Sequence, residues 1–134
     1  MSLELQQRER EGVLILDLGG RITVGDEAGA LRDKLREMCA AGGLNFILNL
    51  KEIDYIDSTG LGAMVMCFTL VGRLGGKLKL ENLNRRNVAL LVLTKLTTVF
   101  EIFNDEQDAV NSFFPDREIK RFDILSFVQE QTGE

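Results

Sequence analysis

The chain has 134 residues, of which 45% are hydrophobic and 28% are charged, and its formal net charge is −5. This length fits one domain whose core needs no disulfide or metal, and the interspersed acids and bases argue against nonspecific nucleic-acid binding. Because no apolar run reaches the ~20 residues that cross a bilayer and no cleavable N-terminal segment is present, we expect a cytoplasmic protein without a membrane contact.

The composition also disfavours catalysis. Histidine is absent from the sequence, which removes the most common general base, the Ser-His and Cys-His pairs and the most common zinc ligand. Cys39 and Cys67 are far apart and each lies in an apolar helical pattern, so we expect buried thiols. We therefore expect no enzyme, no cofactor and no metal.

In the first part of the chain, two strands enclose a helix. Residues 13–18 and 46–50 are near-continuous apolar runs, which are typical of strands covered on both faces. Between them, apolar residues at helical spacing follow Asp26, which we predict to be the N-cap, and the glycines at 42–43 end the helix.

Later elements continue the alternation. A helix begins near Ser58 and ends at the glycines at 75–76, followed by an alternating strand at 77–81, a helix over 84–95, an apolar strand at 99–103 and a helix after Asp105. We expect Val88, Leu91 and Val92 to face the core from the helix over 84–95. Together the elements predict an α/β fold in which helices pack on a small mixed or mostly parallel sheet of about four main strands.

A polar cluster stands out in "YIDSTGLGAM", residues 55–64, where the second strand meets the second helix. In α/β proteins ligands and partners often bind at such a junction, because backbone N–H groups and the helix dipole emerge there. Asp57 or Ser58 is the natural N-cap. A plain structural role, a capped helix with glycines for tight packing, therefore stands beside any functional interpretation.

Three functional interpretations of this stretch can be compared. A phosphate-binding loop needs a Walker or G-x-G-x-x-G pattern, and the stretch has neither. A nucleophile elbow needs glycines two positions on either side of the serine and a histidine to activate it, but Ile56 stands at the first glycine position and the sequence has no histidine. A phosphoacceptor needs only an accessible hydroxyl, because the kinase brings ATP, metal and base. Only this last interpretation fits the composition.

The segment "IDYIDSTGLGAMV" resembles the phosphorylation-site motif of bacterial anti-sigma factor antagonists, whose domain is called STAS. The resemblance extends from about residue 13 to about residue 114, through "GGRITV", "FILNL", "GGKLKLENL" and "LTTVFEIFNDEQDAV". It implies a STAS-like fold over residues 1–114, with residues 115–134 as a C-terminal extension.

The resemblance also implies partner switching. An unphosphorylated antagonist binds an anti-sigma factor that is also a serine kinase, phosphorylation dissolves the complex, and a serine phosphatase would reset it. Carried over to this chain, the acceptor is Ser58, and the residues implied in partner binding are Asp57, Ser58, Thr59, Gly60, Leu61 and Thr23. Met66 joins this set from its place on the helix, where an exposed side chain would reach a partner. Thr23 stands where the family commonly has an aspartate, and Lys95 stands where it usually has a glycine.

Two surfaces leave alternatives open. We expect Met66 and Leu70 to be buried with the rest of their helix, although an exposed pair beside Ser58 would suit a partner groove. We expect the apolar side chains of residues 115–134 to pack back on the domain, whereas pairing of two subunits in a homodimer or docking of a partner are the alternatives. A scaffold or subunit role in a stressosome-like or transporter-associated complex is the alternative function.

Overall fold

The computed structural model describes residues 3–120 and residue 124. Five strands, four α-helices and one 3-10 turn are present in that part of the chain. In chain order they are β1 (Leu3–Arg10), β2 (Val13–Ile22), α1 (Asp26–Ala40), β3 (Asn45–Ile56), α2 (Ser58–Arg73), β4 (Lys77–Glu81), α3 (Arg85–Leu93), η1 (Leu96–Thr98), β5 (Ile102–Phe103) and α4 (Glu106–Asn111).

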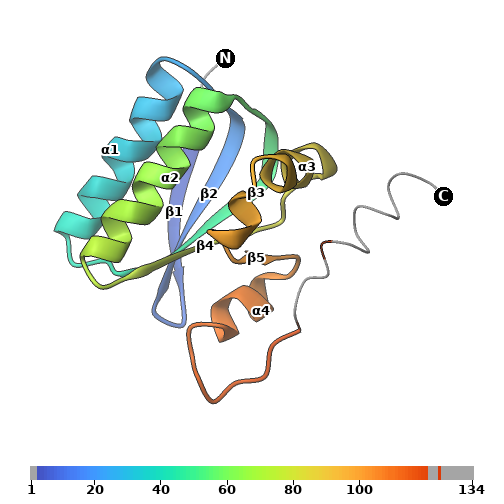
Figure 1. Ribbon diagram of the computed structural model, residues 1–134. Coiled ribbons are helices and arrows are strands. Elements are labelled where there is room, and N and C mark those ends of the chain that lie inside the picture. Colours follow the sequence, from blue (N-terminus) through green and yellow to red (C-terminus); the bar gives the residue numbers. More distant parts are fainter. Residues whose placement is uncertain (1–2, 121–123, 125–134) are drawn as a thin grey trace.

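The strands form one mixed sheet in the order β1-β2-β3-β4-β5. β1 pairs antiparallel with β2, and all other neighbouring strands are parallel. Helices connect the parallel strands, as such crossovers require (Figure 1). The predicted α/β class with a mostly parallel sheet is confirmed.

β1 was not predicted from the sequence. Its sequence, LELQQRER, holds only two apolar residues, Leu3 and Leu5, and both are half-buried. A tight turn at Glu11 and Gly12, both with positive φ, joins it to β2. β1 is an edge strand of the sheet, and charged side chains are common on such strands because they discourage pairing with another chain.

One face of the sheet carries the main core. α1 and α2 lie side by side across it (Figure 1). Alternate residues of the central strands point into this layer, among them Leu16, Phe46, Leu48 and Leu80, all at most 1% exposed. Full burial of such a side chain contributes about 1.5–3 kcal/mol. This packing fixes the strand end and the helix start that carry the predicted motif.

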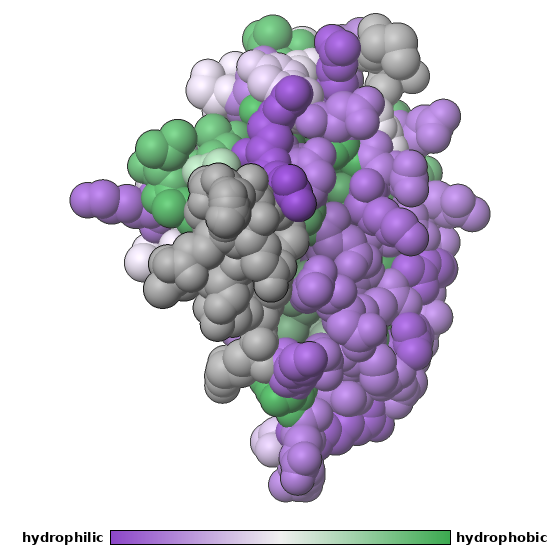
Figure 2. All heavy atoms as spheres, turned by 90° about the vertical axis from the view of Figure 1, so that its right-hand side faces the viewer, coloured by the Kyte–Doolittle hydropathy of each residue, from purple (hydrophilic) through white to green (hydrophobic). Residues whose placement is uncertain are grey.

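The opposite face is covered only in part. Val13, Ile15 and Ile47 point toward α4 and form a smaller core with Ala109 and Val110. The apolar runs at 13–18 and 46–50 predicted strands covered on both faces, and β2 and β3 are covered in this way along these stretches. In Figure 2, hydrophilic residues cover the right half of the molecule, which lies at the back in Figure 1.

Beside this smaller core lies an ionic cluster on the same face. The Nε of Arg8 donates to Asp17 at 2.6 Å, and its Nη1 donates to Glu106 at 2.9 Å. Arg10 also pairs with Glu106. Glu81, from β4, is fully buried next to these groups. The cluster ties the edge strand β1 to α4.

Three local predictions were wrong. The N-cap of α1 is Gly25, with φ of 101°, and Asp26 is the first helical residue. Only Ile102–Phe103 forms a strand in the predicted segment 99–103, because Val99 has a helical backbone and its N–H bonds back to Leu96. The side chain of Val92 is 42% exposed and does not face the core.

Most of residues 115–134 lies outside the described residues. Within the described part, Ile119 packs against the smaller core and Ile124 against the main core. The division of the chain at residue 114 and the packing of the extension as a whole stay predictions.

Candidate functional site

The motif lies where β3 ends and α2 begins, as predicted. Asp57 is the N-cap of α2, with an extended backbone, and its Oδ1 accepts a hydrogen bond from the N–H of Gly60 at 2.7 Å. The carbonyl of Asp57 accepts from the N–H of Leu61 at 2.9 Å. The cap therefore satisfies backbone donors that the first turn of a helix would otherwise leave free.

The same carboxylate binds a second segment of the chain. Its Oδ2 accepts a hydrogen bond from the N–H of Val24 at 2.9 Å, in the loop between β2 and α1. Backbone pairing supports this contact, because the N–H of Asp57 donates to the carbonyl of Ile22 at 3.2 Å. The bonds from Gly60, above all, and from Val24 hold the pKa of Asp57 below its usual value. Asp57 is thus an anion that joins the loop to the helix.

Ser58 follows as the first residue of α2 and is exposed. Among the described residues its hydroxyl has no hydrogen-bond partner. The first turn of α2 contains no acidic residue, so its remaining N–H groups and the helix dipole favour an added negative charge there. The hydroxyl can accept a substituent without the loss of an existing contact.

Gly60 lets the helix approach the sheet. A Cβ built at this position would lie 1.8 Å from the carbonyl oxygen of Ile22 and 2.6 Å from its carbonyl carbon. Real Cβ atoms do not approach backbone so closely, hence any larger residue would push α2 away from the end of β2. The first glycine of the motif is therefore a packing requirement that holds Ser58 beside the loop.

The structure brings most of the predicted site residues together. Thr23 is half-buried in the loop beside Asp57, and its carbonyl accepts the N–H of Ala28 at 3.1 Å. Thr59 is exposed next to Ser58. Leu61, by contrast, belongs to the main core and is only 7% exposed. Its role at the site is to anchor the helix.

Met66 lies on α2 about two turns beyond Ser58, so roughly 12 Å along the helix axis. The side chain is 50% exposed, and the expectation that it would be buried was wrong. Leu70, one turn further, is half-buried. Both side chains line a hollow between α1 and α2, so they stay partly open although they face the neighbouring helix.

Two exposed groups near the motif were not predicted as site residues. Val24 is 67% exposed although its backbone is held by Asp57. Tyr55, two residues before Asp57, is 41% exposed, and the guanidinium of Arg86 lies 6.0 Å from its ring centre. An apolar residue between a threonine and a glycine in a short loop was the available signal for Val24.

The cysteines carry no sign of reactivity. Both are free; Cys39 is half-buried and Cys67 is buried. Burial raises the pKa of the Cys67 thiol to about 12. Among the described residues, no group of three or more His, Cys, Asp or Glu side chains is arranged so that it could hold a metal ion. Within the same part of the chain, no helix is both long and apolar enough to cross a membrane.

The family of the chain follows from comparison with known proteins. Residues 4–109 match the model of the STAS domain. An anti-sigma-B factor antagonist of Bacillus subtilis is 36% identical over 102 residues, which cover 76% of this chain and 92% of the relative. The chain belongs to the STAS domain family.

Further relatives agree with this assignment. An anti-sigma F factor antagonist of Paenibacillus polymyxa is 26% identical over 114 residues, covering 82% of this chain and 94% of the relative. The solved structure of an anti-sigma factor antagonist from Mycobacterium paratuberculosis has a TM-score of 0.71 at 18% identity, with 83% and 93% of the two chains covered. SpoIIAA from Bacillus, solved in its phosphorylated form, has a TM-score of 0.64 at 15% identity, with 82% and 99% covered. These two structures show the shared fold.

Proposed function

We propose that this protein is an anti-sigma factor antagonist that releases its partner when Ser58 is phosphorylated. The observation that carries the proposal is the exposed Ser58 hydroxyl, directly after the capping Asp57 at the start of a well-anchored helix. The curated relatives are named as antagonists of anti-sigma factors, and one structural neighbour was solved in a phosphorylated form. The partner would be an anti-sigma factor that is also a serine kinase, and a serine phosphatase would reset the switch.

The position of Ser58 explains how a phosphate can end binding and leave the fold intact. A phosphoserine adds about −1.5 to −2 charges, which the N-terminus of α2 can accommodate. The same charge on a contact surface, beside the ionised Asp57, must be desolvated next to a like charge. A coupling of ~1–3 kcal/mol already changes affinity about 5- to 150-fold.

Around Ser58, the exposed Val24, Thr59 and Met66 supply contact area, while Gly60 and Leu61 fix the geometry. Thr23 holds the loop through its backbone. We assign the partner surface to this end of the molecule, where the loop after β2 meets the start of α2.

The test is incubation of the purified protein with ATP and each candidate serine kinase of its organism, followed by mapping of the modified residue by mass spectrometry. We expect one phosphate on the wild type and on Thr59→Ala, which lacks the neighbouring exposed hydroxyl, and none on Ser58→Ala. A Ser58→Asp variant should lose partner binding. If Ser58 stays unmodified with every candidate and Ser58→Asp binds partners as well as the wild type, the switch is disproved.

A further inference from the structure

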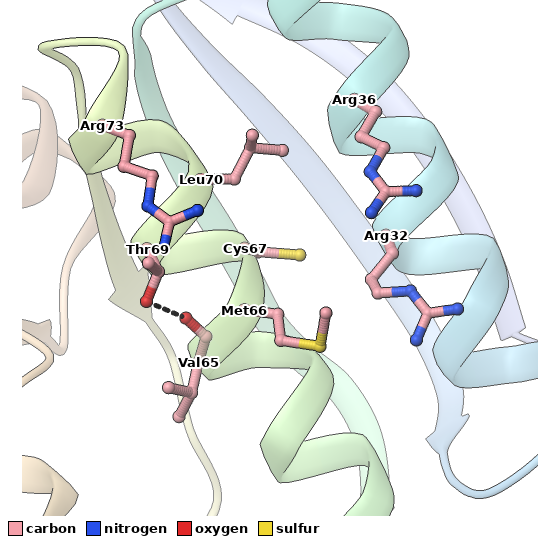
Figure 3. Close-up of a pocket in the computed structure, with 8 residues that line it drawn as sticks. All are labelled: Arg32, Arg36, Val65, Met66, Cys67, Thr69, Leu70 and Arg73. Carbon is pink, nitrogen blue, oxygen red and sulfur yellow. Dashed lines mark hydrogen bonds between the residues drawn. The ribbon is translucent and has the colours of Figure 1, made fainter.

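A groove of about 250 Å³ lies between α1 and α2. Arg32 and Arg36 border it from α1, and Arg73 comes from the end of α2. In Figure 3 the side chains of Met66, Cys67 and Leu70 point from α2 toward α1 and form the floor between the helices. We call this hollow the arginine groove.

The charge of the arginine groove is one-sided. None of the described residues that line it is acidic. Among the described residues, none of the three arginines forms an ion pair or donates a side-chain hydrogen bond. The Nε of Arg32 is buried, and no described residue supplies it with a hydrogen-bond partner. The net charge of the chain is −5, so these three arginines form a local positive patch on an acidic protein.

The floor of the groove is apolar and partly open. Of the floor residues, Met66 is 50% exposed, Leu70 is half-buried and Cys67 is buried. A methionine side chain is flexible and adapts to the shape of an apolar group placed against it. Apolar surface bordered by guanidinium groups suits a ligand that presents both apolar and carboxylate groups.

The spacing of the arginines favours an extended ligand. Arg32 and Arg36 are one turn apart on α1, and Arg73 lies seven positions beyond Met66, roughly 10 Å along α2. A small amphiphile has a single charged headgroup, so it can pair either with the arginines of α1 or with Arg73, but not with both. A helix with acidic residues repeated beside an apolar stripe can satisfy both parts, in the helix-in-groove mode of recognition.

We propose that the arginine groove docks an acidic amphipathic helix of a protein partner. Its apolar side chains would contact Met66 and Leu70, and its carboxylates would pair with Arg32 and Arg36. This surface goes beyond the proposed switch and does not need a phosphate on Ser58. Met66 is the one residue that the two surfaces share.

A peptide titration tests the docking surface without any kinase. The probe is a synthetic helical peptide with leucines and glutamates at helical spacing, and the control peptide carries glutamine in place of each glutamate. We expect amide NMR shifts at Val65, Met66 and Leu70, with weaker binding at high salt. Binding should fall roughly tenfold in the double variant Arg32→Gln, Arg36→Gln, since each loses a charge pair at an interface. Arg85→Gln, an exposed arginine on α3, should bind like the wild type.

Four outcomes would overturn the assignment: equal binding of the glutamine peptide, equal binding by the double variant, shifts confined to the Val24 and Ser58 region, or binding of decanoate but not of the acidic peptide at the groove. Because Arg32 is partly buried, its replacement can also disturb the fold. Met66→Gln therefore provides a second variant that keeps all charges, and it should weaken binding only through the loss of the apolar contact at the floor. Failure here leaves the phosphorylation assay on Ser58 unaffected, so the two proposals can fail separately.

Discussion

The Oδ2 of Asp57 accepts a hydrogen bond at 2.9 Å from the backbone N–H of Val24, which lies 33 positions earlier in the chain. The other carboxylate oxygen caps α2 through Gly60. One side chain therefore fixes both segments that border Ser58. A change at Asp57 acts on the helix start and on the loop together.

Replacement of Asp57 separates this role from simple capping. Asp57→Ala removes both acceptors and should lower the free energy of unfolding by about 1–2 kcal/mol, as loss of an N-cap does. Asp57→Asn keeps one acceptor oxygen, so it should retain the cap and lose mainly the bond to Val24. Urea unfolding gives the two free energies, and amide exchange at Val24 reports the loop. Equal stability of wild type and Asp57→Ala would contradict the assigned cap.

The pH dependence at Asp57 has a definite sign. Its pKa is lowered in the folded protein by the bonds from Gly60 and Val24, so this contribution to stability is present above the unfolded pKa and is lost as the pH falls through the folded value. The N–H of Val24 should therefore become less protected in acid. A protection factor at Val24 that stays constant over this range, after division by the intrinsic exchange rate at each pH, would show that the bond does not depend on the charge.

Two glycines of the motif should respond in opposite ways to the same substitution. Gly60→Ala places a Cβ 1.8 Å from the carbonyl oxygen of Ile22 and should destabilise the protein by about 3 kcal/mol through the shift of α2 that it forces. Gly62→Ala meets nothing within 4 Å and should stabilise α2 by up to about 1 kcal/mol, the difference in helix propensity. Thermal unfolding compares the pair. A tolerated Gly60→Ala would mean that the close approach to β2 is not needed.

The parts of the fold that the sequence predicted are those with strong apolar periodicity. The alternation of strands and helices and the cap at Asp57 follow from local patterns that the residues themselves carry. β1 was missed because an edge strand of charged residues has little apolar signal, and its pairing is supported by the distant contacts of Arg8 with Asp17 and Glu106. The arginine groove joins residues from two helices, so only the packing of α1 on α2 reveals it.

Lys95 stands where the family usually has a glycine, and its backbone is left-handed, with a φ of 63°. Lys95→Gly should therefore stabilise the protein by about 1 kcal/mol, since a side chain with a Cβ is strained there and glycine is not. Lys95→Ala keeps the Cβ and should give no gain. The free energies of unfolding from urea titrations distinguish the two variants. No gain from glycine would show that the strain at Lys95 is offset by other contacts.

Glu81 should make the protein less stable as the pH rises. It is fully buried in β4, neither of its carboxylate oxygens has a hydrogen-bond partner of ordinary geometry among the described residues, and Glu106 lies nearby. Burial, above all, and the proximity of Glu106 raise the pKa of Glu81 well above its ordinary value of 4.5. In the folded protein Glu81 therefore holds a proton that the unfolded chain releases above about pH 4.5.

A group with a raised folded pKa contributes its full stability below the unfolded pKa, and that contribution is lost as the pH rises toward the folded value. Glu81→Gln mimics the protonated acid at every pH, so its stability should exceed that of the wild type at neutral pH and decline less with pH. Glu9→Gln, on the exposed side of β1, makes the same chemical change and should follow the wild-type curve. Urea unfolding across the neutral range gives these curves. Parallel curves for Glu81→Gln and the wild type would show that Glu81 is ionised in the folded protein, with Arg8 compensating its charge.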